Sequence, residues 1–387
     1  MSNPSMQEIG IIMNGVTGRM GTNQHLIRSI LALREDGGVE LPGGERVVPD
    51  PMLVGRNERK LRELSDAHDV DRWAVDPDLE TCLDGDDEIY FDSQVTPRRP
   101  DALRKAIDAG KHVYCEKPLA RDLDTALELA SAAKESDIKH GIVQDKLWLP
   151  GLMKLQRLIE QDFFGDVLSV RVEFGYWVFT GHVQPAQRPS WNYRAEDGGG
   201  IIDDMFSHWS YVLENLFGSV ESVRCLGKTH VSERVDENGE PYEATADDAA
   251  YAIMELEDDV VAQLNSSWTV RVKRDDLLEI KVDGTEGSAV AGLSECETQH
   301  HSNTPKPEWN PDTPTEHDFH DDWESVPDNR AFENAFKTQW ADYVRHVVAD
   351  EPFPWDFLEG AKGVQLTEAS HRSWQEGRRV DVGDLTV

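Results

Sequence analysis

Apolar and polar residues alternate in two rhythms along the first 147 residues. Short, almost wholly apolar runs predict buried strands, and the segments between them carry apolar residues every three or four positions, which predicts amphipathic helices. Strands and helices that alternate at this spacing are typical of a parallel, doubly wound sheet. The predicted strands are 8–14, 52–55, 88–93, 112–118 and 140–144, and the predicted helices are 23–33, 58–68, 100–110 and 123–134.

The pattern changes after Gly165, where longer apolar stretches follow one another with only short turns between them. Consecutive strands of this kind predict a large, mainly antiparallel sheet. We therefore expect two α/β domains, a doubly wound domain over 1–147 and a second domain over 148–387. The strands expected in the second domain are 167–179, 247–257, 260–270 and 277–284, and helical patterns follow at 331–350 and 357–375.

Residues 295–330 show neither rhythm and are rich in Pro, Asp, His and Asn. They predict a long surface insertion that is either mobile or folded over a site. His300, His301, His317 and His320 lie in this segment and could bind a metal ion, but nothing in their spacing fixes a coordination geometry. A solvated acidic loop is the preferred interpretation, and no metal site is predicted.

Acidic residues outnumber basic ones by 74 to 39 among 387 residues, which gives a net charge of −35. A nucleic-acid site needs a positive surface, so this excess argues against nucleic-acid binding. Acidic residues spread along the whole chain instead suggest a surface adapted to high salt, where counterions screen their repulsion. We therefore hypothesise a halophilic source.

The four cysteines lie far apart and form no C-x-x-C pair, which is typical of a reduced protein without a disulfide framework. The first ten residues show neither the basic nor the apolar region of a leader, and no apolar run approaches roughly 18 residues. We expect a cytoplasmic protein with no membrane partner.

Three glycines follow the first predicted strand at a G-x-x-G-x-x-G spacing, and a helical pattern follows them. Glycine lets the backbone turn tightly and lets a pyrophosphate reach the N–H groups at a helix start. An ordinary strand-to-helix turn would also use glycine, but the β/α alternation that follows favours a dinucleotide site. The predicted cofactor-binding residues of this loop are Gly15, Thr17, Gly18, Arg19, Met20 and Gly21.

The end of the second strand usually decides between the two nicotinamide cofactors, because an acid there accepts the ribose 2′-OH of NAD. Here Gly55 takes that position and Arg56 follows. A guanidinium binds a phosphate with paired hydrogen bonds, and Arg19 could assist, so NADP is favoured over NAD. The alternative is that Arg56 is a solvated charge on an acidic protein.

Lys117 stands at the predicted carboxyl end of a parallel strand, in the segment HVYCEKPLA over 112–120. Ligands bind at this edge of open α/β sheets. A lysine there can hydrogen-bond a substrate hydroxyl and stabilise the alkoxide that precedes hydride loss. Glu116, the preceding residue, is expected to take part in cofactor binding.

The segment GGGIIDDMFSHW, residues 198–209, joins three glycines to a helical pattern with two acids and a histidine. A rotation of about 100° per residue puts Asp203 opposite the apolar arc, while Asp204 and His208 share one stripe beside it. A histidine can accept a hydroxyl proton near neutral pH, and an acid can orient it. The glycines would let a ligand approach the backbone closely. The alternative is a His–Asp pair that only tethers the helix.

The segments AGKHVYCEKPLA and GGGIIDDMFSH together resemble the glucose–fructose oxidoreductase / inositol dehydrogenase / MocA family, and the resemblance covers nearly the whole chain. It implies an N-terminal Rossmann domain and an α/β domain with a large, mostly antiparallel sheet. It also implies that Lys117, Asp204 and His208 match the family's catalytic residues. The implied reaction is NAD(P)-linked oxidation of a secondary or anomeric hydroxyl of a sugar or cyclic polyol. The chain departs from the family at Phe206, where glycine is frequent.

Substrate-side residues are predicted from aromatic and hydrogen-bonding side chains near these segments and at the domain junction. They are Tyr176, Trp177, Tyr193, Arg194 and Lys146. An open antiparallel sheet also favours a homodimer or homotetramer that packs sheet faces together. Two other functions stay open. One is a glycosidase that oxidises its substrate transiently and eliminates the aglycone, and the other is a nucleotide-sensing regulator without chemistry.

Overall fold

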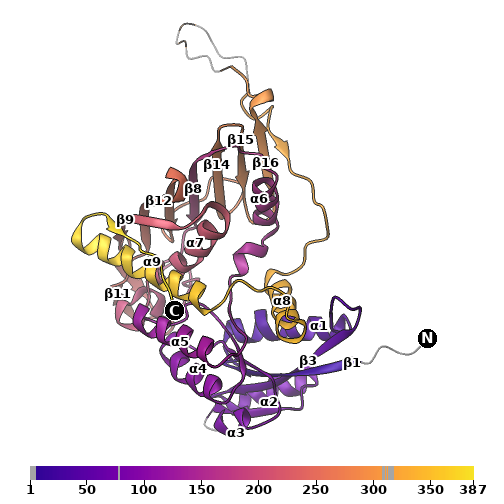
Figure 1. The fold of residues 1–387 in the computed structure, drawn as a ribbon. Coiled ribbons are helices and arrows are strands. Elements are labelled where there is room, and N and C mark those ends of the chain that lie inside the picture. The colour runs from indigo at the N-terminus through magenta and orange to yellow at the C-terminus, as the bar shows by residue number, and fades with distance from the viewer. Residues whose placement is uncertain (1–5, 77–78, 307–309, 311, 313–317) are drawn as a thin grey trace. The chain divides into compact units, whose positions relative to one another are not determined.

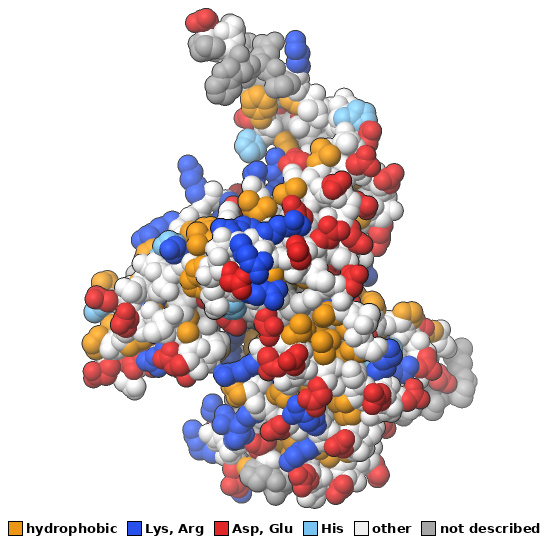
Figure 2. Space-filling model, turned by 60° about the vertical axis from the view of Figure 1, so that its left-hand side comes forward, with side chains coloured by type: hydrophobic (Ala, Val, Ile, Leu, Met, Phe, Trp, Pro, Cys, Tyr) orange, Lys and Arg blue, Asp and Glu red, His pale blue; other side chains and the backbone are white. Residues whose placement is uncertain are grey.

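The computed structural model describes the chain except for residues 1–5, 77–78, 307–309, 311 and 313–317. The chain divides into two compact units. The first comprises Met1–Trp148, Glu333–Gln365 and Asp384–Val387, and the second comprises Leu149–Phe332 and Leu366–Gly383. Acidic side chains are spread over the face seen in Figure 2 rather than gathered in one patch.

The first unit is built on a parallel sheet in the strand order β4-β3-β1-β5-β6-β7, with β2 paired antiparallel to β3. Its strands are β1 (Met6–Asn14), β2 (Val39–Glu40), β3 (Arg46–Gly55), β4 (Trp73–Val75), β5 (Ile89–Asp92), β6 (His112–Cys115) and β7 (His140–Ile142). The chain runs outward from β1 in one direction and then in the other, so the strand order reverses beside β1. Ligands of such sheets bind at the carboxyl ends of the strands next to this reversal. The predicted doubly wound sheet is confirmed.

Two apolar cores lie on opposite faces of this sheet, because successive residues of a strand point to opposite sides. On β1, Ile12 belongs to one core, with α4 and α5, while Ile11 and Met13 belong to the other, with η1 and α8. The helices are η1 (Gly21–Leu31, of π type), α1 (Ala32–Glu35), α2 (Glu58–His68), α3 (Leu79–Leu83), η3 (Thr96–Arg98), α4 (Arg99–Asp108), α5 (Leu123–Glu135), η4 (Asp145–Trp148) and α8 (Ala335–Ala349).

Helix α8 packs in the first unit, although the sequence pattern predicts that all of 148–387 belongs to the second domain. The Trp340 ring lies 4.9 Å from that of Phe91, and Tyr343 stacks on Tyr114 at 4.6 Å. An amphipathic pattern shows that one face of a helix is buried but not which sheet covers it. The return of residues 333–365 to the first unit therefore could not be read from that pattern.

The second unit is built on a nine-stranded sheet in the order β17-β16-β15-β14-β8-β13-β12-β9-β18. Every pair is antiparallel except β13 with β8. The strands are β8 (Val167–Gly175), β9 (Val220–Lys228), β12 (Ala249–Leu256), β13 (Val261–Ser267), β14 (Leu278–Gly284), β15 (Gly287–Ala291), β16 (Cys296–His300), β17 (Glu324–Ser325) and β18 (Val380–Asp381), beside a hairpin of β10 (Glu233–Val235) and β11 (Pro241–Glu243). The predicted large, mainly antiparallel sheet is confirmed.

Helices cover one face of this sheet, with α6 against β15 and β16 and α7 against β9, β12 and β13. Helix α9 begins in the first unit and ends in the second, where Trp374 packs against Gly227 of β9. The elements are α6 (Pro150–Glu160), η5 (Ser190–Tyr193), η6 (Ala195–Asp197), α7 (Ile201–Phe217), η7 (Glu257–Asp259), η8 (His301–Asn303) and α9 (Phe357–Glu376). Among the described residues, no helix is long and apolar enough to cross a membrane.

Part of the predicted surface insertion at 295–330 belongs to the sheet. Residues 296–300 form β16 and residues 324–325 form β17, and both add to the edge of the sheet. An edge strand needs few apolar residues, and here only Cys296 of β16 is fully buried, so the apolar signal was too weak to predict a strand. His317, which the sequence analysis considered as a metal ligand, lies outside the described residues.

Candidate active site

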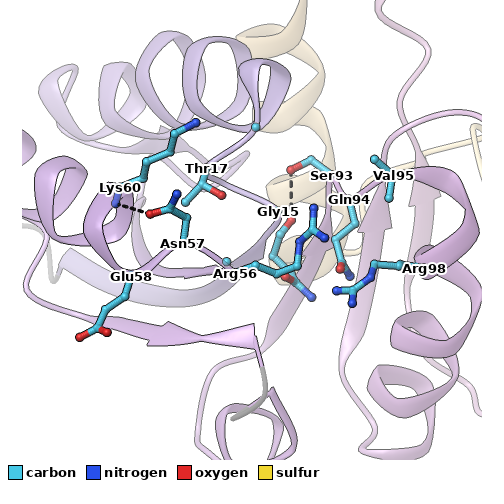
Figure 3. Close-up of a pocket in the computed structure, with 13 residues that line it drawn as sticks. Gly15, Thr17, Arg56, Asn57, Glu58, Lys60, Ser93, Gln94, Val95 and Arg98 are labelled. Atoms are coloured by element: carbon cyan, nitrogen blue, oxygen red, sulfur yellow. Dashed lines mark hydrogen bonds between the residues drawn. The ribbon is translucent and has the colours of Figure 1, made fainter. Parts of the chain in front are cut away.

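A pocket of about 610 Å³ opens where β1, β3 and β5 end, at the expected edge of the first sheet. Figure 3 shows its lining, which comes from three loops. The end of β1 and the loop after it supply Asn14, Gly15, Thr17 and Gly18. The end of β3, the loop after it and the first turn of α2 supply Gly55, Arg56, Asn57, Glu58 and Lys60. The loop after β5 and η3 supply Ser93, Gln94, Val95 and Arg98.

The glycines of the first loop are required by close packing. Gly15 has a φ of +83°, and its N–H donates to the carbonyl of Val54 at 3.0 Å. A Cβ on Gly21 would lie 2.6 Å from the carbonyl oxygen of Gly15 and 2.7 Å from Oγ of Ser93. Only glycine lets the loop fold so tightly before the helix begins. The loop therefore presents a helix start to the pocket, which suits a pyrophosphate.

Asn14 adds an acceptor to this pocket. Its Nδ2 donates to the Tyr90 hydroxyl at 2.9 Å, while its buried Oδ1 has no hydrogen-bond partner among the described residues. A buried polar atom is normally paired, so the pocket holds an acceptor that suits a hydroxyl or amide donor. Together with the glycine loop, this fits a bound dinucleotide.

Gly15, Thr17, Gly18 and Arg56 line the pocket, as the sequence predicts for a cofactor site. The other predicted cofactor residues are Arg19, Met20, Gly21 and Glu116, and they are not among its lining residues. Arg19 to Gly21 belong to the helix that starts behind the loop. Glu116 is buried, and its Oε1 lies 2.8 Å from Nε2 of His25.

Basic side chains line the pocket on the walls after β3 and after β5. Figure 3 shows Arg56 and Arg98 directed toward one another, while Glu58 points away. The carboxylate of Glu58 accepts a hydrogen bond from Arg62 at 2.6 Å, and Arg98 forms an ion pair with Asp76 at 2.7 Å. Lys60 is a further basic residue of the lining. The pocket wall after β3 thus favours an anionic group.

Lys117 follows the carboxyl end of β6, as predicted. Its backbone N–H donates to Oε2 of Glu116 at 3.1 Å, and its side chain is half-buried. Burial raises the pKa of Glu116, but the hydrogen bond from His25 and the nearby charges outweigh it, and the net pKa is lowered. Glu116 is therefore an anion that holds the backbone of Lys117.

In the second unit, α7 begins at Ile201 directly after the three glycines. The carbonyl of Asp247 accepts from the N–H of Ile201, and its Oδ2 accepts from the N–H of Ile202, both at 2.9 Å. A Cβ on Gly199 would lie 2.4 Å from the carbonyl oxygen of Trp191, and one on Gly200 would lie 2.6 Å from Oδ1 of Asp247. At Gly199 and Gly200, the space that a side chain would fill is taken by the chain's own polar groups.

Asp247 was not anticipated from the sequence. It is 3 % exposed, and burial raises its pKa to about 6, although the hydrogen bond from Ile202 acts in the opposite direction. An acid at a helix start accepts the otherwise unpaired N–H groups there. Its signal is weak in the sequence because it lies 45 residues after Ile202, whose N–H it caps at the helix start.

Asp204 and His208 both lie on α7, four residues apart. Oδ2 of Asp204 accepts from Arg188 at 2.8 Å, and Nδ1 of the buried His208 lies 2.7 Å from the Tyr211 hydroxyl. Asp203, expected to face solvent, is 42 % exposed and forms an ion pair with Nε2 of His371 at 2.8 Å. The two neighbouring acids thus belong to different networks, as their places on the helix predict.

Arg188 connects several site residues and was missed by sequence reasoning. Besides Asp204, it donates to the hydroxyl of Tyr176 and to Oδ1 of Asn192, both at 3.2 Å, and its guanidinium lies 4.4 Å from the centre of the Trp268 ring. Burial lowers the pKa of Arg188, but attraction to Asp204 and Tyr176 outweighs it and raises it overall. Its only sequence signal was its position between two predicted aromatic segments.

The remaining predicted substrate residues have other partners. The Trp177 ring packs under Arg271 at 3.6 Å, Arg194 lies over Tyr242 at 4.5 Å, and Lys146 forms an ion pair with Asp145 at 2.5 Å. Tyr193 is fully buried beneath Arg234, and burial raises its pKa. Of the five, Tyr176 alone shares Arg188 with Asp204 among the contacts of the described residues.

Two family models match the chain. One, described as the GFO/IDH/MocA C-terminal domain, matches residues 152–290, and the other, described as an oxidoreductase family with an NAD-binding Rossmann fold, matches residues 94–142. A D-xylose dehydrogenase of Paenarthrobacter nicotinovorans is 52 % identical over 383 residues, which cover 98 % of each chain. The chain belongs to the GFO/IDH/MocA oxidoreductase family. The family expected from the sequence is thereby confirmed.

Solved structures show the same GFO/IDH/MocA fold. A levoglucosan dehydrogenase in complex with NADH and L-sorbose superposes with a TM-score of 0.81 at 18 % identity and covers 98 % of this chain and 100 % of that one. An aldose–aldose oxidoreductase of Caulobacter crescentus complexed with glycerol gives a TM-score of 0.74 at 16 % identity, over 97 % and 99 % of the two chains. This family member is a sugar dehydrogenase that uses a nicotinamide cofactor, as predicted.

Proposed function

We propose that this enzyme oxidises D-xylose and prefers NADP⁺ over NAD⁺. The substrate proposal rests on one observation, the 52 % identity to a D-xylose dehydrogenase over 98 % of both chains. The experiment follows nicotinamide reduction in high salt with D-xylose, other aldoses, inositols and levoglucosan, each with either cofactor. Turnover with D-xylose at least about tenfold more efficient than with the other sugars supports the proposal. Preference for an inositol or levoglucosan overturns it.

The same experiment identifies the hydroxyl that reacts. Loss of hydride from the anomeric carbon gives a lactone, which opens to an acid, whereas loss from a secondary carbon gives a keto sugar. Product analysis separates the two. Cofactor that stays bound through dialysis and turns over without net reduction, while a glycoside is cleaved, would instead indicate the glycosidase reaction.

His208 is proposed as the base that takes the hydroxyl proton. For Nε2 to accept it, Nδ1 must carry the ring hydrogen and donate it to the Tyr211 oxygen 2.7 Å away. Tyr211 then orients the imidazole, as a third group does in other acid–base sites. The hydrogen-bond distance and the burial of His208 support this role.

Lys117 is proposed to donate a hydrogen bond to the reacting oxygen, and Asp204 to hold substrate and imidazole in place. A bound nicotinamide supplies the hydride acceptor. Lys117 stabilises the charge that develops on oxygen as the proton leaves, and a fixed ammonium costs no reorganisation at that moment. Arg188 orients Asp204 through its 2.8 Å hydrogen bond. Arg188 acts through Asp204 and is a positioning residue.

The preference for NADP⁺ is supported by the pocket wall after β3. Gly55 offers no carboxylate to a ribose 2′-OH, while Arg56 and Lys60 line the pocket nearby. A charge-assisted hydrogen bond contributes about 1.5–3 kcal/mol, so Arg56→Ala should lower kcat/KM for NADP⁺ by about 10- to 100-fold and leave NAD⁺ within about threefold. Equal losses with both cofactors would contradict the assignment. Arg59→Ala is the matched control, because it removes an exposed cation of α2 that pairs with Glu63 and does not line the pocket.

A homodimer through the open sheet face is proposed as the assembly. Tyr251 and Ile253 of β12 are exposed on the face away from α7, and Leu226 of β9 lies opposite Tyr251 in the register. Exposed apolar rows of this kind mark interfaces. Sedimentation should give a dimer or larger for the wild type and a monomer for Ile253→Asp. Val183→Asp, at a 94 % exposed position, is the control and should keep the wild-type mass.

We also propose a cytoplasmic location, because all four cysteines are buried as free thiols. Burial raises the pKa of the Cys225 and Cys296 thiols to about 12. Thiols of this kind are inert and need no oxidising compartment. Fractionation of the source cells with an antibody tests it, and recovery from outside the cytoplasm would refute it.

A further inference from the structure

His25 is a buried polar residue that the reaction outlined above does not use. It lies on η1, fully buried, with the rings of Phe91 and Phe336 centred 4.4 and 5.2 Å away. Its two ring nitrogens nevertheless have partners. Nδ1 lies 3.0 Å from Nε1 of Trp340, and Nε2 lies 2.8 Å from Oε1 of Glu116.

These partners determine which nitrogen of His25 carries the hydrogen. The indole N–H of Trp340 is a donor only, so Nδ1 of His25 must accept. A neutral imidazole then has its hydrogen on Nε2, which donates it to the Glu116 carboxylate. Trp340 therefore selects the tautomer of His25 that can bind Glu116.

Glu116 continues the chain of hydrogen bonds to Lys117. One carboxylate oxygen accepts from His25, and the other accepts from the backbone N–H of Lys117 at 3.1 Å. The carboxylate of Glu116 is ionised at neutral pH, because its pKa is lowered. Three elements distant in sequence, α8, η1 and the end of β6, are joined in this way.

The position of His25 connects these hydrogen bonds to the candidate active site. His25 lies one helical turn after Gly21, where η1 starts behind the glycine loop of the pocket. Glu116 lies where β6 ends, directly before Lys117. A buried hydrogen bond in surroundings of low dielectric is strong, and its loss leaves a carboxylate without its partner.

We propose that His25 is a positioning residue that holds Lys117 in its reactive place through Glu116, with Trp340 fixing the tautomer that makes this possible. The inference rests on the proposed role of Lys117. It extends the site beyond the three motif residues and connects the helix at the cofactor pocket with the residue that touches the substrate. Loss of His25 then affects turnover more than binding.

The test compares His25→Gln with His25→Leu in the full chain. The glutamine amide keeps both functions, because its oxygen can accept from Trp340 and its NH₂ can donate to Glu116, whereas leucine keeps only bulk. We expect His25→Leu to lower kcat by about 30- to 100-fold, with KM for the sugar and Kd for the cofactor within about threefold. His25→Gln should restore kcat to within about threefold of wild type.

Two further variants separate positioning from folding. Trp340→Phe keeps the aromatic packing and removes only the donor, and we expect kcat about fivefold lower. His140→Leu is the matched control, because it removes another histidine of the first unit, whose Nδ1 accepts from the N–H of Phe357, and kcat should stay within twofold. Thermal unfolding of every variant reports folding independently of activity.

The NMR shifts of the His25 ring nitrogens test the tautomer without any turnover. The hydrogen should be on Nε2 in the wild type, and a hydrogen on Nδ1 would overturn the proposal. Equal kcat for His25→Leu and the wild type, or equal losses for the leucine and glutamine variants, would also overturn it.

Lys117→Met separates this proposal from the proposed function. Full activity of Lys117→Met would remove the role of Lys117, and the inference with it. An inactive Lys117→Met beside a fully active His25→Leu would overturn only the role of His25. If His25 acts through Lys117, adding His25→Leu to Lys117→Met causes no further loss.

Discussion

Two glycine clusters stand at helix starts in this chain, and they serve different ends. Gly15, Gly18 and Gly21 fold into a tight loop whose first two members line an open pocket in the first unit. Gly199 and Gly200 precede α7 in the second unit, and the space beside them is filled by the carbonyl of Trp191 and the side chain of Asp247. In the sequence, both clusters resemble places where a ligand meets the backbone.

The comparison shows that glycine signals a close approach without naming the group that approaches. A missing Cβ makes room within about 3 Å of the backbone, and a ligand, a neighbouring strand or a buried acid can use that room. In the first cluster the helix start faces the pocket, whereas in the second cluster Asp247 accepts hydrogen bonds from the N–H groups at the helix start. The second cluster therefore builds the scaffold that holds Asp204 and His208.

The largest expected effect separates chemistry from binding. Lys117→Met and His208→Ala should each lower kcat by about 10³-fold, because each removes a group that acts on the reacting hydroxyl. Cofactor Kd should stay within about threefold, since neither residue lines the glycine pocket. Steady-state kinetics and a fluorescence titration measure the two quantities. A parallel loss of cofactor binding would show that these residues have been given the wrong role.

One glycine-to-alanine substitution in each cluster tests the comparison directly. Gly21→Ala puts a Cβ 2.6 Å from the Gly15 carbonyl, so cofactor binding should weaken about 100-fold. Gly199→Ala puts one 2.4 Å from the Trp191 carbonyl, so the free energy of unfolding should fall by about 2–3 kcal/mol with cofactor Kd unchanged. Titration and denaturant unfolding of both variants check this. The reverse pattern would show that the second cluster meets the ligand.

Asp247 makes the free energy of unfolding depend on pH. Its pKa is about 6 in the folded chain and about 3.9 when unfolded, so between these values the folded state binds the extra proton. Stability due to Asp247 therefore falls as pH rises from about 4 to about 6, by on the order of 3 kcal/mol. Unfolding of wild type and Asp247→Asn at several pH values measures the difference. A wild-type stability that rises against the variant over this range would refute the assignment.

The smallest expected effect concerns the orientation of His208. Tyr211→Phe removes the hydroxyl 2.7 Å from Nδ1 and keeps the ring, so kcat should fall about tenfold while stability changes by less than about 1 kcal/mol. Initial rates measure kcat, and thermal unfolding measures the stability of the variant. An unchanged kcat would mean that the imidazole is held by other contacts.

Local patterns were sufficient for the parts of the site that lie within one element. The 3.6-residue period placed Asp204 and His208 together on α7 and separated them from Asp203, which pairs with His371. The glycine spacing and the strand before it predicted the loop that lines the pocket after β1. The pairing of Glu116 with His25, 91 residues away, had no local signal in the sequence.

The sequence by itself determined the long strands and helices that carry a clear pattern, the two sheets, the motif residues and the family, because each depends on periodicity or on spacing within a short segment. Only the tertiary structure decided that α8 returns to the first unit, that Asp247 fills the start of α7, and that Arg188 holds Asp204. These are pairings between segments far apart in the chain. Burial makes such pairings strong, and their partners are chosen by packing in three dimensions, which no local pattern records.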